Sequence, residues 1–455
     1  MNFCSKVLYA VLFAASFTVS AAAQSAAPPP PSTTPRHITL SEAVELALKH
    51  NHFARIAGFK VEEMKDAKDV ARSAYLPSIK NESRVLRVTD TQSIEIARGS
   101  LGTIGGTPIP AETDLLNQGG KTFVTSGTTL AQPVSQLFTR VKPANDAARA
   151  DVNASVADAR ETLNEVSLKV HQIYYKLLIA SLRGNAAEAR IRANQALQSE
   201  RGEQVKYGSS LDEQLIESRA QVLQAKQDLL TTQLQISDLT MQLNDAIGLP
   251  VTTQLVLDTN VPGAPETCQR EDCVQIARAS HPEVVAARAE VEKASAGVRL
   301  SKADYYPDVS AFARYSYQNN VPFLARNFGT FGAELTYDLF DGGKRRASVK
   351  ESDAKLAQAK ENLARISDDV EVQVESALNR LNRTKEMVSV AEELLTLRSE
   401  SSRVTAQQLL KGEALQSQAD AGVAQELDAK AQLLAAQLDY AQAHDELLQA
   451  MGQTP

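Results

Sequence analysis

The sequence contains no tryptophan, and aromatic residues fill only 5% of its 455 positions. Ala, Gln, Glu, Leu, Lys and Arg are abundant instead, a composition more typical of long-helix proteins than of compact enzymes. A block of like charge is also lacking, because the formal net charge of −7 comes from acidic and basic residues that are well mixed along the chain. This pattern gives no basis for binding nucleic acid.

Long apolar runs are nearly absent as well. The run near the start, Val7–Val19, follows Lys6 and precedes the small residues Ala21–Ala23. It is too short to span a bilayer, and the arrangement predicts a secretory signal peptide over residues 1–23. We expect the Pro-rich segment 24–37 to be disordered. If the chain enters a membrane, it must do so with β-strands rather than helices.

Proline is missing between Pro143 and Pro250, and apolar residues recur there at spacings of three and four. Such spacing with polar flanks predicts coiled-coil packing. A single helix over residues 140–206 would be about 100 Å long at about 1.5 Å per residue, which is too long for a compact core. The same pattern returns over residues 344–450. We therefore predict two helical struts, each followed by a second helix.

The order of these patterns occurs twice, which indicates an internal duplication. The first copy covers residues 38–249 and opens with a helix whose N-cap is Thr39 or Ser41. Two strands follow at about 79–90 and 121–132, joined by a long loop rich in Gly and Thr. The long helix and the second helix complete this copy.

The second copy covers residues 268–452 and is separated from the first by a Pro- and Gly-containing linker, 250–267. Its strands are expected at about 308–318 and 329–340. The predicted fold is therefore mostly α with a small β part, in the order helix, strand, strand, long helix, helix, twice over.

The strands of the second copy alternate between apolar and polar residues, which is the pattern of transmembrane β-strands. An antiparallel sheet that covers a soluble core alternates in the same way. Two observations favour the membrane: the predicted signal peptide, and the positions of Arg314, Glu334 and Asp338, which would line a wet lumen. Four strands cannot close a barrel, and open edges are not tolerated in lipid. Three chains would supply twelve strands.

Several features together resemble the TolC-like outer-membrane efflux proteins over about residues 38–452. They are the signal peptide, the opening Ile38–Ala43, the Leu76–Pro77 and Tyr306–Pro307 helix ends, Tyr337–Gly343, and the glycines at 208 and 412. The resemblance implies a homotrimer in which a twelve-stranded β-barrel in the outer membrane continues into a long α-helical barrel across the periplasm. It also implies an exit duct that works with a periplasmic adaptor and an inner-membrane efflux pump or ABC exporter.

In this family the two turns between paired helices contact the adaptor. The corresponding residues here are Tyr207, Gly208, Ser209 and Leu211 in the first copy, and Lys411, Gly412 and Leu415 in the second. Both turns keep a Gly followed by a Leu, which suits a tight helix-to-helix connection.

The family closes its periplasmic mouth with acidic residues shortly after the second turn. Asp420 occupies such a position here, and Asp212 follows the first turn. A ring of three carboxylates would repel anions and attract cations in a narrow pore. The alternative is an ordinary solvated helix face.

Cys268 and Cys273 flank four residues at the start of the second copy. In an oxidising periplasm a local disulfide is plausible and would stiffen the entry into this copy, whereas free thiols are the alternative. The spacing fits no standard zinc site.

Two functional hypotheses follow. The first is a passive outer-membrane exit duct in contact with outer-membrane lipid, with no cofactor or metal of its own. The second is a periplasmic coiled-coil adaptor or scaffold without a pore. An enzyme is disfavoured, because the sequence offers no convincing pair of nucleophile and base.

Overall fold

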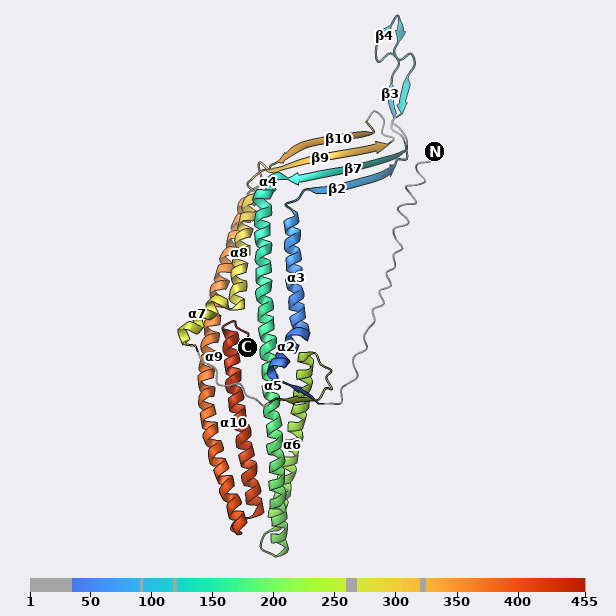
Figure 1. Ribbon diagram of the computed structural model, residues 1–455. Helices are drawn as coiled ribbons and strands as arrows, with labels where there is room; N and C mark the ends of the chain where they lie inside the picture. The colour runs from blue at the N-terminus through green and yellow to red at the C-terminus, as the bar shows by residue number, and fades with distance from the viewer. Residues whose placement is uncertain (1–34, 91–92, 118–120, 259–267, 320–324, 455) are drawn as a thin grey trace.

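The computed structural model of the chain describes residues 35–90, 93–117, 121–258, 268–319 and 325–454. The predicted signal peptide and nearly all of the Pro-rich segment lie outside the described residues. Figure 1 shows an elongated molecule with a small sheet at one end and long helices that extend from it. The prediction of a mostly α fold with a small β part is confirmed for the described residues.

Two helices extend from the sheet to the far end of the molecule (Figure 1). They are α5 (Lys142–Lys206), with 65 residues, and α9 (Lys344–Lys411), with 68 residues. Both struts therefore form where the apolar spacing and the absence of proline predicted them. In the described part of the chain, the helices are too short or too polar to cross a bilayer.

Shorter helices pack beside these two struts. Beside the half near the sheet lie α3 (His52–Ser73), against α5, and α8 (Pro282–Ala303), between α5 and α9. Beside the far half lie α6 (Asp212–Ile247), against α5, and α10 (Gln416–Ala450), between α5 and α9. Since α5 contacts helices from both copies along its whole length, it joins the two copies into one layer.

Each copy begins with two helices rather than one. The predicted helix region 38–74 is divided into α2 (Leu40–His50) and α3 by Asn51, whose extended backbone interrupts the helix and whose side chain accepts a hydrogen bond from Phe53 N at 2.9 Å. Thr39 caps α2, as predicted, by accepting from Glu42 N at 3.2 Å. Short polar side chains at such a break satisfy backbone N–H groups that the next helix leaves unpaired.

His281 has the same role in the second copy. It separates α7 (Arg270–Ser280) from α8, so the single predicted helix leading to Tyr306 is also divided. The His281 ring accepts from Glu283 N through Nδ1 at 3.3 Å, and only 2% of the residue is exposed. This burial lowers the pKa of His281, although Glu283 opposes the shift.

The sheet has the strand order β10-β9-β7-β2, and every neighbouring pair is antiparallel. Its strands are β2 (Ser78–Arg87), β7 (Thr122–Pro133), β9 (Asp308–Asn319) and β10 (Asn327–Thr336). All four predicted strands are present. The last one ends earlier than expected, so Asp338 lies beyond the strand and is not a strand residue.

The loop between β2 and β7 is more structured than predicted. It contains two small antiparallel pairs that project beyond the sheet (Figure 1). They are β3 (Ser93–Ile96) with β6 (Asp114–Asn117), and β4 (Thr103–Ile104) with β5 (Thr107–Pro108). A Gly-rich composition suggested only a loop, but glycines at positive φ, such as Gly105 and Gly106, also form the tight turns that hairpins require.

Two segments expected to be irregular form a parallel pair. β1 (Arg36–Ile38) pairs with β8 (Leu255–Leu257). Arg36 and His37 therefore do not belong to a disordered segment, and the linker 250–267 contains a strand. Ile38 is fully buried, and its carbonyl oxygen accepts a hydrogen bond from the hydroxyl of Tyr174 on α5 at 3.1 Å.

The main apolar core lies where α2, α5, α6 and α10 meet, around residues such as Val170, Leu243 and Leu438. A polar contact is buried beside it. His171 Nδ1 on α5 lies 2.6 Å from Asp445 Oδ2 on α10, and the Tyr175 hydroxyl lies 3.4 Å from the same oxygen. Burial and the nearby carboxylate both raise the pKa of Tyr175, so this hydroxyl stays protonated and can donate.

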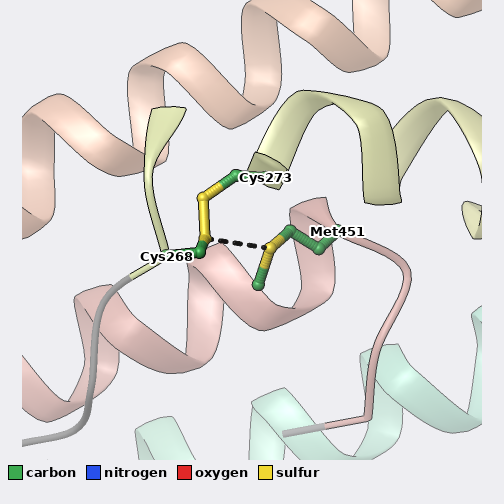
Figure 2. The surroundings of a disulfide bond; sticks show 3 residues. All are labelled: Cys268, Cys273 and Met451. Atoms are coloured by element: carbon green, nitrogen blue, oxygen red, sulfur yellow. Dashed lines mark hydrogen bonds between the residues drawn. A yellow bond between two sulfur atoms is a disulfide. The ribbon is translucent and has the colours of Figure 1, made fainter. Parts of the chain in front are cut away.

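Cys268 and Cys273 are joined by a disulfide, with their Cα atoms 5.9 Å apart (Figure 2). Cys273 is fully buried in a second core formed by α7, α9 and the end of α10. The sulfur of Met451 lies 3.6 Å from Cys268 Sγ. The bridge therefore lies over the end of α10. Two ion pairs, Arg270 with Glu375 and Arg278 with Glu371, also hold α7 against α9.

Asp445→Ala should destabilise the helical layer by about 3 kcal/mol, because it leaves His171 and Tyr175 buried without their shared partner. The measurement is the free energy of unfolding from denaturant titration of the helical circular-dichroism signal. Gln432→Ala, an exposed change on the same helix, is the matched control and should stay within about 0.5 kcal/mol of the parent. Equal stabilities of the two variants would contradict the importance of the buried contact.

The free energy of unfolding should also fall as the pH drops below about 6.5. Near this pH a histidine in the unfolded chain takes up a proton, whereas His281 in the folded chain takes up its proton only at lower pH. His281→Asn keeps a capping acceptor but does not titrate, so it should reduce the loss of stability between pH 7 and pH 5. His52→Asn changes an exposed histidine and serves as the control. An unchanged pH dependence in the His281 variant would refute this assignment.

Candidate functional site

The sheet has one charged face. In an antiparallel ladder, residues directly opposite each other point to the same face, and successive residues alternate. Applied to the three strand pairings, this rule places all charged strand residues except Arg87 on one side. This charged face consists of Lys80, Glu82 and Arg84 on β2, Asp308 and Arg314 on β9, and Glu334 on β10.

Arg314 extends across the charged face from β9 toward β2. A Cβ atom on Gly127 of β7 would lie only 2.8 Å from a guanidinium nitrogen of Arg314. Glu82 lies directly opposite Gly127 on the next strand and forms an ion pair with Arg84. The small residue on β7 therefore leaves room for a positive side chain near the carboxylate of Glu82.

The opposite face is uncharged apart from Arg87, but its two halves differ. On β9 and β10 it is apolar, with residues such as Ala313 and Leu335. On β2 and β7 it carries short polar side chains that bind one another, including Asn81 Nδ2 to Thr128 Oγ1 at 2.8 Å and Ser83 Oγ with Ser126 Oγ at 2.9 Å. These satisfied polar residues explain why the first-copy strands alternate poorly in sequence.

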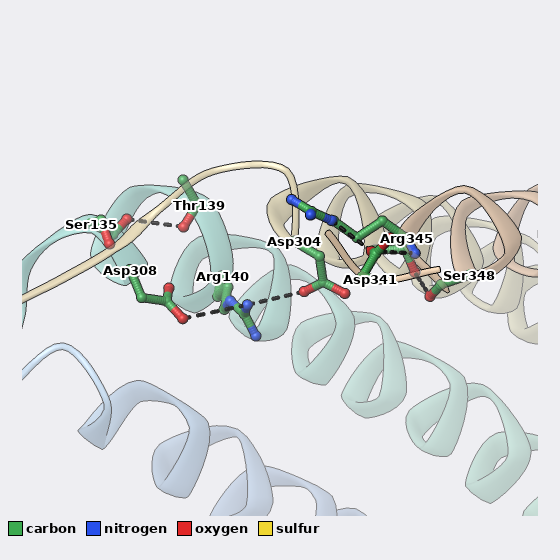
Figure 3. A network of polar contacts seen from close by, with 9 residues as sticks. Ser135, Thr139, Arg140, Asp304, Asp308, Asp341, Arg345 and Ser348 are labelled. Atoms are coloured by element: carbon green, nitrogen blue, oxygen red, sulfur yellow. Dashed lines mark hydrogen bonds and ion pairs between the residues drawn. The ribbon is translucent and has the colours of Figure 1, made fainter. Parts of the chain in front are cut away.

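A polar network joins the sheet to the helices (Figure 3). Arg140 lies between Asp304 and Asp308, at 3.0 and 3.7 Å from their carboxylate oxygens. The backbone N–H of Val309, at the start of β9, donates to Ser135 Oγ at 2.8 Å. These contacts tie the base of β9 to the segment that connects β7 with α5.

Asp341 organises the other junction, between β10 and α9 (Figure 3). Its carboxylate accepts from Gly343 N and Arg345 N, both at 3.0 Å, and pairs with Arg345 Nε at 2.7 Å. The hydrogen bond from the Arg345 side chain is the main interaction that lowers the pKa of Asp341, to about 2. The Arg345 guanidinium also lies over the rings of Tyr305 and Tyr337. The Asp-Gly-Gly sequence thus caps a helix where the chain leaves the strand.

The two predicted turns lie at the end of the molecule farthest from the sheet (Figure 1). Gly208 and Gly412 adopt φ values of +70° and +73°, which favour glycine. Leu211 and Leu415 follow with extended backbone and precede the next helices. Tyr207 is 77% exposed, so the first turn presents an aromatic side chain to its surroundings.

The remaining turn residues, Ser209 and Lys411, differ in their contacts. The Ser209 hydroxyl donates to the carbonyl oxygen of Gln204 at 2.9 Å, whereas Lys411 ends α9 and is exposed. Asp212 is the exposed first residue of α6, where a carboxylate complements the helix N-terminus. Asp420 on α10 is half-buried and accepts from Gln416 Nε2 at 3.0 Å.

Glu200 forms a contact between the two copies that the sequence did not predict. It lies on α5, yet its carboxylate accepts from the backbone N–H of Ser417 at 2.9 Å and from the Ser417 hydroxyl. Ser417 belongs to the first turn of α10, so Glu200 caps a helix from the other copy. The contact joins the two helical hairpins near their free ends.

Residues 273–453 match the family model of the outer membrane efflux proteins. No curated protein sequence matches the chain significantly. Several solved structures do match the chain. The outer membrane channel CmeC of Campylobacter jejuni has a TM-score of 0.71 at 15% identity, with 91% of this chain and 85% of that chain covered.

Two further solved structures are similar to this chain. VceC, an outer membrane protein of Vibrio cholerae, has a TM-score of 0.69 at 15% identity and covers 91% of this chain and 96% of its own. The open state of the MtrE outer membrane channel of Neisseria gonorrhoeae has a TM-score of 0.70 at 16% identity, with 91% and 89% covered. The chain thus has the fold of outer-membrane efflux channels. The family match over residues 273–453 and these similar structures confirm the resemblance noted in the sequence.

Glu200→Ala should loosen the start of α10 by roughly 1 kcal/mol, because it removes a helix cap. Hydrogen exchange of the backbone amides at 416–419 should become several-fold faster. Glu203→Ala is the matched control, since the Glu203 carboxylate forms an exposed ion pair with Lys206 at 3.6 Å on its own helix. Unchanged exchange in the Glu200 variant would show that the contact does not hold the hairpins together.

Proposed function

We propose that this chain is the outer-membrane exit duct of a tripartite efflux or type I secretion system. It passively conducts substrates that an inner-membrane pump delivers through a periplasmic adaptor. The observation that carries the proposal is the sheet with all its charged residues except Arg87 on one face and with two open edges, attached to struts of 65 and 68 residues. A scaffold without a pore, the alternative, would have no use for such a sheet.

The duct is a homotrimer. Two helices expose apolar stripes at heptad-like spacing that no described part of the chain covers. The stripe on α6 consists of Ile216, Leu223, Leu230 and Leu234, each at least 62% exposed. The stripe on α9 consists of Met387, Val390, Leu397 and Val404. Packing α6 of one chain against α9 of the next covers both stripes and supports the closure of twelve strands.

The charged face lines the lumen of the barrel, and the opposite face contacts outer-membrane lipid. Arg314 and Glu334, both proposed from the sequence, lie on the lumen side, together with Lys80, Glu82 and Arg84. The helices then extend into the periplasm, and the turns around Gly208 and Gly412 contact the adaptor. Asp212 and Asp420, close to these turns, narrow the mouth with negative charge.

Purified protein from outer-membrane fractions should have the mass of three chains in detergent, measured by light scattering. In planar bilayers it should form pores. Asp420→Asn should reduce the selectivity for potassium over chloride, because it removes three carboxylates from the trimeric mouth. Asp428→Asn on the same helix is the control. A monomer in the soluble periplasmic fraction would exclude the duct and leave the scaffold.

A further inference from the structure

Within the described residues, the two edge strands of the sheet, β2 and β10, have no strand partner on their outer sides. They carry charges of opposite sign near the end of the sheet that joins the helices. All ten residues of β2 and all ten of β10 are exposed, whereas most residues of β7 are half-buried. Lys80 is the third residue of β2, and Glu334 is the third from the end of β10. Among the described residues, neither side chain forms an ion pair in the single chain.

The geometry of the sheet allows these edges to meet when copies assemble. The alternation of directions through β9 and β7 makes β2 and β10 antiparallel to each other. An antiparallel seam between β2 of one copy and β10 of the next therefore continues the existing ladder. We call the register level when the first residue of β2 and the last residue of β10, both next to the helices, lie opposite each other. In this register Ser78 faces Thr336 and Lys80 faces Glu334.

Alternative registers are less favourable. A shift of one residue would turn the charged face of one copy toward the lipid side of the next. A shift of two residues in one direction would place Glu334 directly opposite Glu82, and like charges opposite each other are destabilising. The level register sets Glu334 opposite Lys80 and keeps both charged faces on the same side. A shift of four residues would instead set Glu334 opposite Arg84, which already forms an ion pair with Glu82.

We propose that each seam of the trimer is closed by a cross-copy ion pair between Lys80 of one chain and Glu334 of the next, in the register that places Asn81 opposite Ala333. The partner is a second copy of this chain, chosen by the charge complementarity of the two edges. The inference rests on the proposed trimeric duct and adds the residues that set its strand register.

Cysteine pairs on the opposite face test the register without removing either charge. Asn81→Cys with Ala333→Cys places two thiols directly across the proposed seam, where Cβ atoms lie about 5 Å apart. Ser83→Cys with Ala333→Cys is the matched control for the register shifted by two residues. Intact trimers in outer membranes, treated with the short thiol cross-linker dibromobimane, should give a covalent trimer far more readily with the Asn81 pair than with the Ser83 pair.

Neutralising the charges tests the ion pair itself. Lys80→Gln and Glu334→Gln should each lower the temperature at which the trimer dissociates in detergent. The trimer of the double variant should dissociate at a temperature no lower than that of the less stable single variant. Additive losses would refute the ion pair. A trimer that cross-links best through Ser83 would refute the register and leave the duct standing, whereas a monomeric mass would refute the duct itself.

Discussion

An unpaired strand edge is the constraint on which this architecture depends. The sheet has four strands in the described part of the chain, and its two outer strands present backbone N–H and C=O groups on edges that no other described strand pairs with. In lipid each such group would cost several kcal/mol, so the proposed duct pairs each edge with another copy. In that proposal the apolar stripes of α6 and α9 are covered by the same neighbouring copy. One assembly would then satisfy the sheet and the helices at once, and the strand seam and the helix seam would be two parts of a single interface.

The long helices could be predicted because their signal is repeated many times. Apolar residues at spacings of three and four over more than a dozen turns outweigh any single unusual position. The breaks at Asn51 and His281 escaped prediction because each depends on one capping side chain within an otherwise helical pattern. The pairing of Arg36–Ile38 with Leu255–Leu257 could not be foreseen either, since a short parallel pair between distant segments leaves no periodic pattern in the sequence.

The charged face was predictable only in the second copy. There, Arg314 and Glu334 stand among apolar neighbours and mark the wet side, whereas Asp338 was misplaced because the strand stops at Thr336. In the first copy, hydrogen-bonded side chains such as Asn81 and Thr128 make the opposite face polar and hide the alternation. Contacts such as that between Glu200 and Ser417 join residues far apart in sequence, and a glutamate on a helix surface carries no sign of such a partner.

The charges of the proposed lumen largely neutralise one another. Glu82 pairs with Arg84, and Asp308 pairs with Arg140. If the seam pairs Lys80 with Glu334, Arg314 is the one residue of the charged face, among the described strands, that is left without an equal and opposite partner. A wall of paired charges is hydrated but has a weak net field, so it neither holds a substrate tightly nor excludes one by sign. Selection by charge would then occur at the opposite end of the proposed duct, where Asp212 and Asp420 lie near the turns between the paired helices.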